Sequence, residues 1–179
     1  MTTTRLTKEK WVAIGLDTLT AEGPAAMRAE YLCRVAGTTK GSFYWHFADI
    51  EAFREEVLDH WASAAVDNAR RDHTEANGLR DAASAAAFWG DPNCAEAWAE
   101  PAIRGWAYYD MAAQNAVART DEARFEVLRR RLARAGINNP DFATLMLAVA
   151  NQNAGKGPAA DAETTRVVGT LADLIAALE

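Results

Sequence analysis

Apolar residues recur every three or four positions along most of the chain, the spacing that places them on one face of an α-helix. The first such segment begins after Thr7, which can cap a helix, and ends at Gly23-Pro24. Its expected buried residues are Trp11, Val12, Gly15, Leu16 and Leu19. Because runs of alternating β-branched residues are missing, the pattern predicts an all-α protein of about nine helices.

Two short helices are expected next. The first short helix is expected over residues 27–35, with Leu32 and Val35 facing inward. Gly37 ends it, because glycine adopts a left-handed conformation at little cost. One of the two threonines that follow caps the second helix, which is expected to reach about His46.

A long helix follows, with Asp49 as its expected cap and an end near residue 72. Its predicted apolar face is Ile50, Phe53, Val57, Trp61 and Ala64. The three helices before it fall within about 40 residues, and a glycine-containing turn joins the second to the third. This arrangement is typical of a helix-turn-helix unit.

The remainder of the chain is also expected to be helical. Gly136 ends one helix, and Phe142, Leu145, Met146 and Val149 are the expected inward residues of the next. The expected helices are 79–89, 93–99, 101–115, 122–135, 141–153 and 160–178.

Composition narrows the class of protein. A chain of 179 residues can form one large or two small domains, and none of its apolar runs approaches the ~20 residues of a membrane span. The N-terminal residues carry no apolar stretch typical of a signal peptide. Two cysteines, Cys33 and Cys94, do not form a disulfide framework. We therefore expect a cytoplasmic protein without membrane partners.

Charge is distributed unevenly. Residues 1–47 hold six Lys and Arg against four Asp and Glu, a balance of +2, whereas residues 48–179 hold 13 against 21, a balance of −8. A nucleic acid would be repelled by the acidic part and tolerated by the N-terminal part.

Residues 38–47 carry the most informative chemistry. Phe43 and Phe47 lie four positions apart on one side of the expected helix, and Gly41 allows its backbone a close approach to a neighbour. The side chains at the other positions can donate hydrogen bonds, and none is acidic: Lys40, Ser42, Tyr44, Trp45 and His46. Such a helix suits DNA phosphates and the major groove, and the alternative is an aromatic lid over a small core.

Residues 41–47 resemble the recognition-helix signature of the TetR family of bacterial transcriptional regulators, and residues 36–40 resemble its turn. The specific resemblance covers about residues 8–61. Beyond it, the likeness consists of chain length, the helical pattern and residues 101–110 and 121–124, which are similar to effector domains of that family.

The resemblance implies an N-terminal three-helix DNA-binding domain, residues 1–48, joined by a long fourth helix to an effector-binding and dimerisation domain, residues 49–179. It implies a homodimer that places two recognition helices in successive major grooves of a palindromic operator. This homodimer is expected to be a repressor that a small, mostly apolar molecule releases from the operator. The expected partners are double-stranded DNA, a small-molecule effector and a second copy of the chain. The expected DNA contacts are Arg28, Thr39, Lys40, Gly41, Ser42, Tyr44, Trp45 and His46.

Two positions depart from the family pattern. Glu30 and Ile50 stand where many relatives carry a basic residue, and each missing phosphate contact lowers the slope of the salt dependence by roughly one unit. Arg28, with Arg5, Lys8 and Lys10, can compensate. We expect operator recognition of modest affinity.

Aromatic residues gather between positions 88 and 111, and they predict a pocket for a mostly apolar effector. The predicted lining is Trp89, Trp98, Trp106, Tyr109 and Met111. The alternative is that these side chains are simply core. Arg104 is expected to pair with Asp110, and the alternative is that the two residues hold a polar group of the ligand.

The last two predicted helices carry apolar stripes that the same pair of helices from a second subunit could cover, giving a four-helix bundle. The predicted interface is Leu145, Val149, Val167, Leu171, Leu174 and Leu178. Burial within one chain is the alternative.

The sequence gives little indication that the protein is an enzyme. Ser42 and His46 share a helix face as a nucleophile and base could, but no third, orienting acid is evident, and the sequence has no HExxH motif and no glycine-rich phosphate loop. We expect no catalytic residues, no metal and no cofactor. A regulator that answers to a protein partner, or one that has lost DNA binding, is the other alternative.

Overall fold

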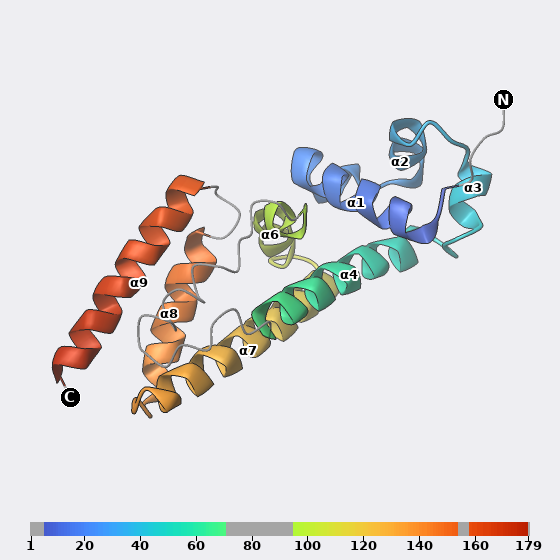
Figure 1. Ribbon diagram of the computed structural model, residues 1–179. Coiled ribbons are helices and arrows are strands. Elements are labelled where there is room, and N and C mark those ends of the chain that lie inside the picture. Colours follow the sequence, from blue (N-terminus) through green and yellow to red (C-terminus); the bar gives the residue numbers. More distant parts are fainter. Residues whose placement is uncertain (1–5, 71–94, 154–157, 179) are drawn as a thin grey trace.

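The computed structural model describes residues 6–70, 95–153 and 158–178 (Figure 1). These residues form eight α-helices and one 3-10 helix, with no strand among them, which confirms the all-α prediction. None of the described helices could cross a membrane. The elements are α1 (Lys8–Glu22), η1 (Pro24–Ala26), α2 (Ala29–Val35), α3 (Lys40–Tyr44), α4 (Ile50–Arg70), α6 (Ala95–Trp106), α7 (Met111–Arg134), α8 (Pro140–Asn153) and α9 (Pro158–Leu178).

The molecule is elongated, with α1, α2 and α3 gathered at one end and α8 and α9 at the other (Figure 1). Helices α4 and α7 connect the two ends. They run side by side in the same direction, because Arg119 pairs with Asp59 at 2.5 Å while Val127 shares a hydrophobic cluster with Ala69. Because α7 contacts α4 over most of the length of α4, a shift of α7 would displace α4 as well.

A first hydrophobic cluster fills the end that holds α1, α2 and α3. It contains all the residues predicted for the buried face of α1 apart from the side-chain-free Gly15, which is also buried. Ile103 and Trp106 of α6 and Ala113 of α7 belong to the same cluster. The cluster thus extends across the predicted domain boundary at residues 48 and 49, and that boundary stays a prediction.

A second cluster occupies the opposite end. Leu128 and Leu132 of α7 pack there with Met146 of α8 and Val168 of α9. Leu145, expected to face inward, is 50% exposed, because Ala143, Met146 and Ala150 form the buried face of α8 instead. Small residues at two of these positions allow α8 to pack closely against its neighbours.

The inward face of α2 was also predicted wrongly in part. Leu32 is buried as expected, but Val35 is exposed and Cys33 is buried in its place. A seven-residue helix has only two turns, so the apolar spacing does not define one face; the packing of α2 against α1 and α3 decides it.

The expected helix boundary at Pro101 is wrong as well. Pro101 lies inside α6, and Ala99 and Ile103 on either side of it are fully buried, so packing outweighs the lost backbone hydrogen bond. The next helix starts at Met111 rather than near residue 122, with Asp110 as its cap: Oδ1 of Asp110 accepts from the backbone N–H of Ala113 at 2.9 Å. The expected helix 79–89 lies outside the described residues.

Candidate nucleic-acid interface

The turn between α2 and α3 has the geometry that the sequence predicts. Gly37 has φ of 62°, in the left-handed region that favours glycine. The N–H of Thr38 donates to the carbonyl of Cys33 at 2.9 Å, and the N–H of Gly37 donates to the carbonyl of Arg34 at 3.2 Å. These two bonds form a Schellman motif, which ends α2 and fixes the direction in which α3 leaves.

Helix α3 begins at a threonine cap. Oγ1 of Thr39 accepts from the N–H of Ser42 at 3.3 Å, and the regular helix ends at Tyr44, two residues before the expected end. A cap and a Schellman turn on such a short segment hold its backbone in one orientation before any ligand binds.

The apolar side of α3 rests on an aromatic cluster. The ring of Phe43 is fully buried and lies 5.3 Å from Trp11 and 5.2 Å from Phe53, in edge-to-face arrangements. Phe47 packs 4.9 Å from Phe53. Aromatic rings from α1 and α4 therefore pack against the buried side of α3. Phe43 and Phe47 lie in the core, as predicted.

The other side of α3 is on the surface. Tyr44 is 51% exposed and Trp45 is 69% exposed. Thr39, Lys40 and Gly41 are exposed as well, whereas Ser42 and His46 are half-buried. The structure thus brings most of the predicted DNA contacts together on one exposed surface.

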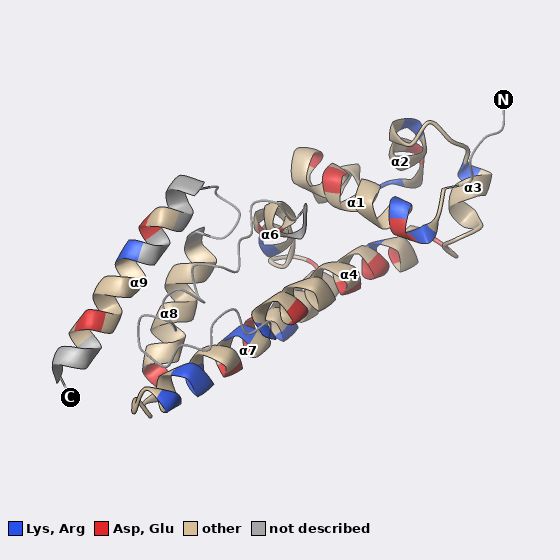
Figure 2. Cartoon of the chain, in the orientation of Figure 1, with Lys and Arg blue, Asp and Glu red and all other residues tan. Residues whose placement is uncertain are grey.

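Charge on this surface is mixed. Lys40 pairs with Glu30 at 2.5 Å, and their hydrogen bond lowers the pKa of Glu30 and raises the pKa of Lys40, so both groups are charged at neutral pH. Lys8 pairs with Glu56 of α4 at 2.7 Å. Figure 2 shows Lys and Arg on α1, α2 and α3, and Asp and Glu along α4. A phosphate must therefore compete with Glu30 for Lys40.

His46 makes a contact within the chain. Its Nε2 donates to the backbone carbonyl of Leu6 at 2.8 Å, which fastens the segment before α1 to the loop after α3. Because Nε2 makes this contact, a phosphate would have to bind through Nδ1, and Nδ1 donates only when the imidazole is protonated. The predicted phosphate contact of His46 stays a prediction.

Arg54 is a residue that the sequence reasoning missed. Its Nε and Nη2 donate to the backbone carbonyl of Met27 at 3.1 and 2.8 Å, so α4 holds the start of the α2 segment. Arg28, the expected additional contact, is exposed beside it. A basic residue in the second turn of the long helix is the only signal that could have indicated this role.

Comparison with known proteins identifies the fold. No protein-family model matches this sequence, and no curated protein matches it. A solved structure from Rhodococcus sp., assigned to the TetR family of transcriptional regulators, is 17% identical, covers 93% of this chain and 97% of its own, and has a TM-score of 0.76. The chain has the TetR-family fold.

Two further solved structures share the TetR-like fold. A transcriptional regulator from Rhodococcus sp. Rha1 is 17% identical over 92% of this chain and 95% of its own, with a TM-score of 0.75. A protein assigned as a transcriptional regulator from Streptomyces coelicolor A3(2) is 17% identical over 92% and 97%, with a TM-score of 0.67.

In this TetR-like fold the predicted effector-pocket residues do not converge. Trp106 is buried in the first hydrophobic cluster, whereas Tyr109 and Met111 are largely exposed and Trp98 is partly exposed. Trp89 lies outside the described residues. An enclosed aromatic pocket therefore receives no support from the placement of these side chains.

The predicted dimer residues lie on α8 and α9. Leu145 is 50% exposed and Leu174 is 58% exposed. Val149, Val167 and Leu171 are half-buried, and the side chain of Leu178 lies outside the described residues. The two helices thus leave part of their apolar surface uncovered within one chain.

The sequence reasoning also missed a buried ionic network inside the TetR-like fold. Glu100 and Arg124 are only 1% and 2% exposed, and Nη1 and Nη2 of Arg124 donate to Glu100 at 2.6 and 2.9 Å. Arg104 donates to Glu100 at 2.8 Å and to Asp121 at 2.6 and 3.1 Å. Asn151 of α8 joins it by donating to Asp121 at 3.0 Å.

This network corrects the expectation that Arg104 pairs with Asp110. Asp110 caps α7 instead, and Arg104 points to carboxylates on α6 and α7. Burial by itself would raise the pKa of Glu100, but attraction and hydrogen bonds from Arg124 and Arg104 outweigh it and hold the pKa below 4.5. No group of three or more potential metal ligands lies among the residues that the structure describes.

Proposed function

We propose that the protein is a homodimeric transcriptional regulator that binds operator DNA through α3 and is released by a small effector. The observation that carries this proposal is the two-sided character of α3: Phe43 is buried among aromatic rings while Tyr44 and Trp45 are exposed beside it. The TetR-like fold, which three proteins assigned as regulators share, supports the same class.

In the proposed complex, α3 enters the major groove. Gly41 lets the backbone approach the base edges, and Thr39, whose Oγ1 already accepts an internal bond, has its hydroxyl proton free for a phosphate. Tyr44 donates from the exposed face to the sugar-phosphate backbone. Lys40 exchanges Glu30 for a phosphate, because a DNA backbone offers it a stronger field than one solvated carboxylate.

Dimerisation is proposed through α8 and α9. Leu145 and Leu174 expose apolar surface whose burial against a second copy is favourable, at about 25 cal/mol per Å² of apolar area. An isologous contact between the two helix pairs makes a four-helix bundle and sets the separation of the two copies of α3.

Selection of bound duplexes from a random pool tests the proposal, because it reports binding, symmetry and half-site spacing together. A palindrome with half-sites about 10 base pairs apart, or a multiple of that, is expected. Failure to enrich any duplex, or enrichment of asymmetric sites alone, would overturn the proposal.

Anisotropy of a labelled selected duplex then tests α3 itself. Tyr44→Phe should weaken binding by up to about tenfold, the worth of one hydrogen bond. Tyr109→Phe is the matched control, since Tyr109 is also an exposed tyrosine but lies in the α6–α7 connection. Equal affinities for both variants would place the DNA contact elsewhere.

A further inference from the structure

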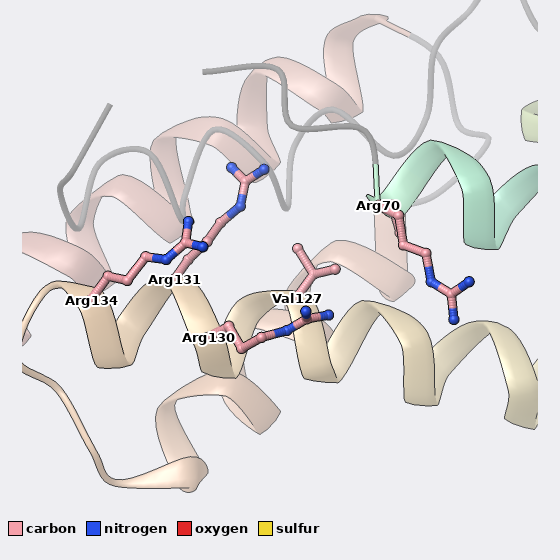
Figure 3. Close-up of a pocket in the computed structure, with 6 residues that line it drawn as sticks. Arg70, Val127, Arg130, Arg131 and Arg134 are labelled. Carbon is pink, nitrogen blue, oxygen red and sulfur yellow. The ribbon is translucent and has the colours of Figure 1, made fainter. Parts of the chain in front are cut away.

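Basic side chains are placed differently at the two ends of the molecule. At the end away from α3, Arg70 and three arginines of α7 line a hollow of about 450 Å³ (Figure 3). At the other end, the lysine that begins α3 lies against a carboxylate: Nζ of Lys40 is 2.5 Å from Oε1 of Glu30, whose side chain is 79% exposed. A carboxylate on a surface that faces a polyanion is unfavourable unless it meets a hydrogen-bond donor.

Glu30 depends on Lys40 for its neutralisation. Among the residues that the structure describes, Lys40 is the only one that forms an ion pair with Glu30. Their hydrogen bond is the main cause that lowers the pKa of Glu30, whereas Arg28 adds only a weaker attraction from farther away. In the proposed complex Lys40 leaves Glu30 for a phosphate. The Glu30 carboxylate is then charged, close to the DNA and without its cation.

The position of Glu30 allows it to reach a base. Its bond to Lys40 places a carboxylate of α2 beside the first residue of α3. The pKa of Lys40 is raised mainly by this hydrogen bond and also by Tyr44, which therefore lies nearby. In helix-turn-helix complexes, the first residues of the recognition helix contact base edges in the major groove. Glu30 thus lies at the end of α3 where bases are read.

The major groove offers few donors to a carboxylate. Guanine presents N7 and O6 there, and thymine presents O4, and all three atoms are acceptors. Adenine presents its N6 amino group beside the acceptor N7, so a carboxylate meets one donor and one acceptor. Cytosine presents its N4 amino group and no acceptor of its own. The chemistry of the groove therefore favours cytosine as the partner of a carboxylate.

We propose that Glu30 determines operator specificity: once Lys40 has released it, its carboxylate accepts a hydrogen bond from the N4 amino group of one cytosine in each half-site. This inference rests on the proposed function and deepens it. A duplex with another base at that position leaves Glu30 without a donor among the phosphates and binds more weakly. Lys40 thus adds affinity for any sequence, and Glu30 selects against sequences that lack the cytosine.

Duplex selection with wild type, Glu30→Ala and Glu56→Ala tests the inference. Glu56→Ala is the matched control, because Glu56 is also a carboxylate paired with a surface lysine, Lys8, at 2.7 Å, and both variants change the net charge equally. Wild type and Glu56→Ala should enrich a cytosine at one position of each half-site, and Glu30→Ala should lose that preference alone. Because Glu30 is exposed, its replacement should leave the melting temperature within about 2 °C of wild type.

A chemically altered base gives a second test that already works with the wild-type protein. N4-methylcytosine at the enriched position replaces the N–H that faces the major groove and leaves guanine O6 and N7 in place. In anisotropy measurements, wild-type affinity should fall tenfold or more, whereas the same base outside the half-sites should change it by less than about twofold. For Glu30→Ala, methylation at either position should change affinity by less than about twofold.

Several results would overturn the inference: enrichment of the same cytosine by Glu30→Ala, an equal methylation effect in wild type and Glu30→Ala, or enrichment of adenine at the position that depends on Glu30. Tighter binding of all duplexes by Glu30→Ala, by one common factor, would overturn it too, because the carboxylate would then only repel DNA. A wild type that enriches palindromes whose base preferences do not depend on Glu30 refutes this inference alone. A wild type that enriches no duplex refutes the proposed function as well.

Discussion

Replacing Glu100 with glutamine tests the buried ionic network while keeping the shape of the side chain. In the native protein, the Glu100 carboxylate accepts three hydrogen bonds of 2.6–2.9 Å from Arg124 and Arg104. The substitution leaves Arg124, which is 2% exposed, without its carboxylate, whereas Arg104 keeps Asp121. Removing one partner of a buried pair costs about 3–5 kcal/mol, and the amide oxygen that remains places Glu100→Gln near the lower figure.

A loss of about 3 kcal/mol is large beside a total stability of roughly 5–15 kcal/mol. For a chain of this length, it corresponds to a fall of about 6–12 °C in the melting temperature. Thermal unfolding followed by circular dichroism at one fixed protein concentration measures it. Glu126→Gln on α7, the helix that carries Arg124, is the control, because its partner Arg129 is exposed; the melting temperature of this variant should stay within about 2 °C of wild type.

The pH dependence gives the same test a second readout. The pKa of Glu100 is lower in the folded than in the unfolded chain. The stability that its carboxylate contributes is therefore complete at a pH above the unfolded pKa and is lost as the pH falls through the folded pKa. Glutamine does not titrate there. The difference in melting temperature between wild type and Glu100→Gln should therefore become smaller in acid. A melting temperature within 2 °C of wild type at neutral pH, or a gap that widens in acid, would refute this account.

Three further outcomes are expected. Gly15→Ala should destabilise the protein by about 1–2 kcal/mol in urea unfolding, because its Cβ would lie 2.7 Å from Val57 and 2.8 Å from Phe53, both fully buried. Gly105→Ala is the control: its Cβ would meet nothing within 4 Å, so it should be neutral or stabilising by about 0.5 kcal/mol in the same assay. Gly37→Ala should cost about 1–2 kcal/mol in the same assay, since φ of 62° is strained for any side chain with a Cβ, and unchanged stability would contradict the turn geometry. Leu174→Glu should shift sedimentation toward monomer at micromolar concentration, while Leu6→Ala, far from α9, should not; a wild type that is already monomeric removes the proposed interface.

The predictions that were confirmed depend on residues close together in sequence. Either Thr38 or Thr39 was expected to cap α3, and Thr39 does so; Asp49 was expected to cap α4, and its Oδ1 accepts from the N–H of Ala52 at 2.7 Å. The Gly37 turn and the buried face of α1 follow from local backbone preference and from a regular apolar spacing over four turns. Where only two turns were present, as in α2, the spacing misassigned Val35.

The amino-acid sequence by itself determined that the chain is helical, where α1, α3 and α4 begin, and that residues 38–47 have one apolar and one polar side. Each of these properties is decided within a few residues, by caps, turns and the 3.6-residue period. Tertiary structure alone decided that Arg124 meets Glu100, that α6 continues through Pro101, and that Arg70 lies beside the arginines of α7. These depend on how distant helices bury one another's side chains, a free energy summed over the whole core that no local pattern contains.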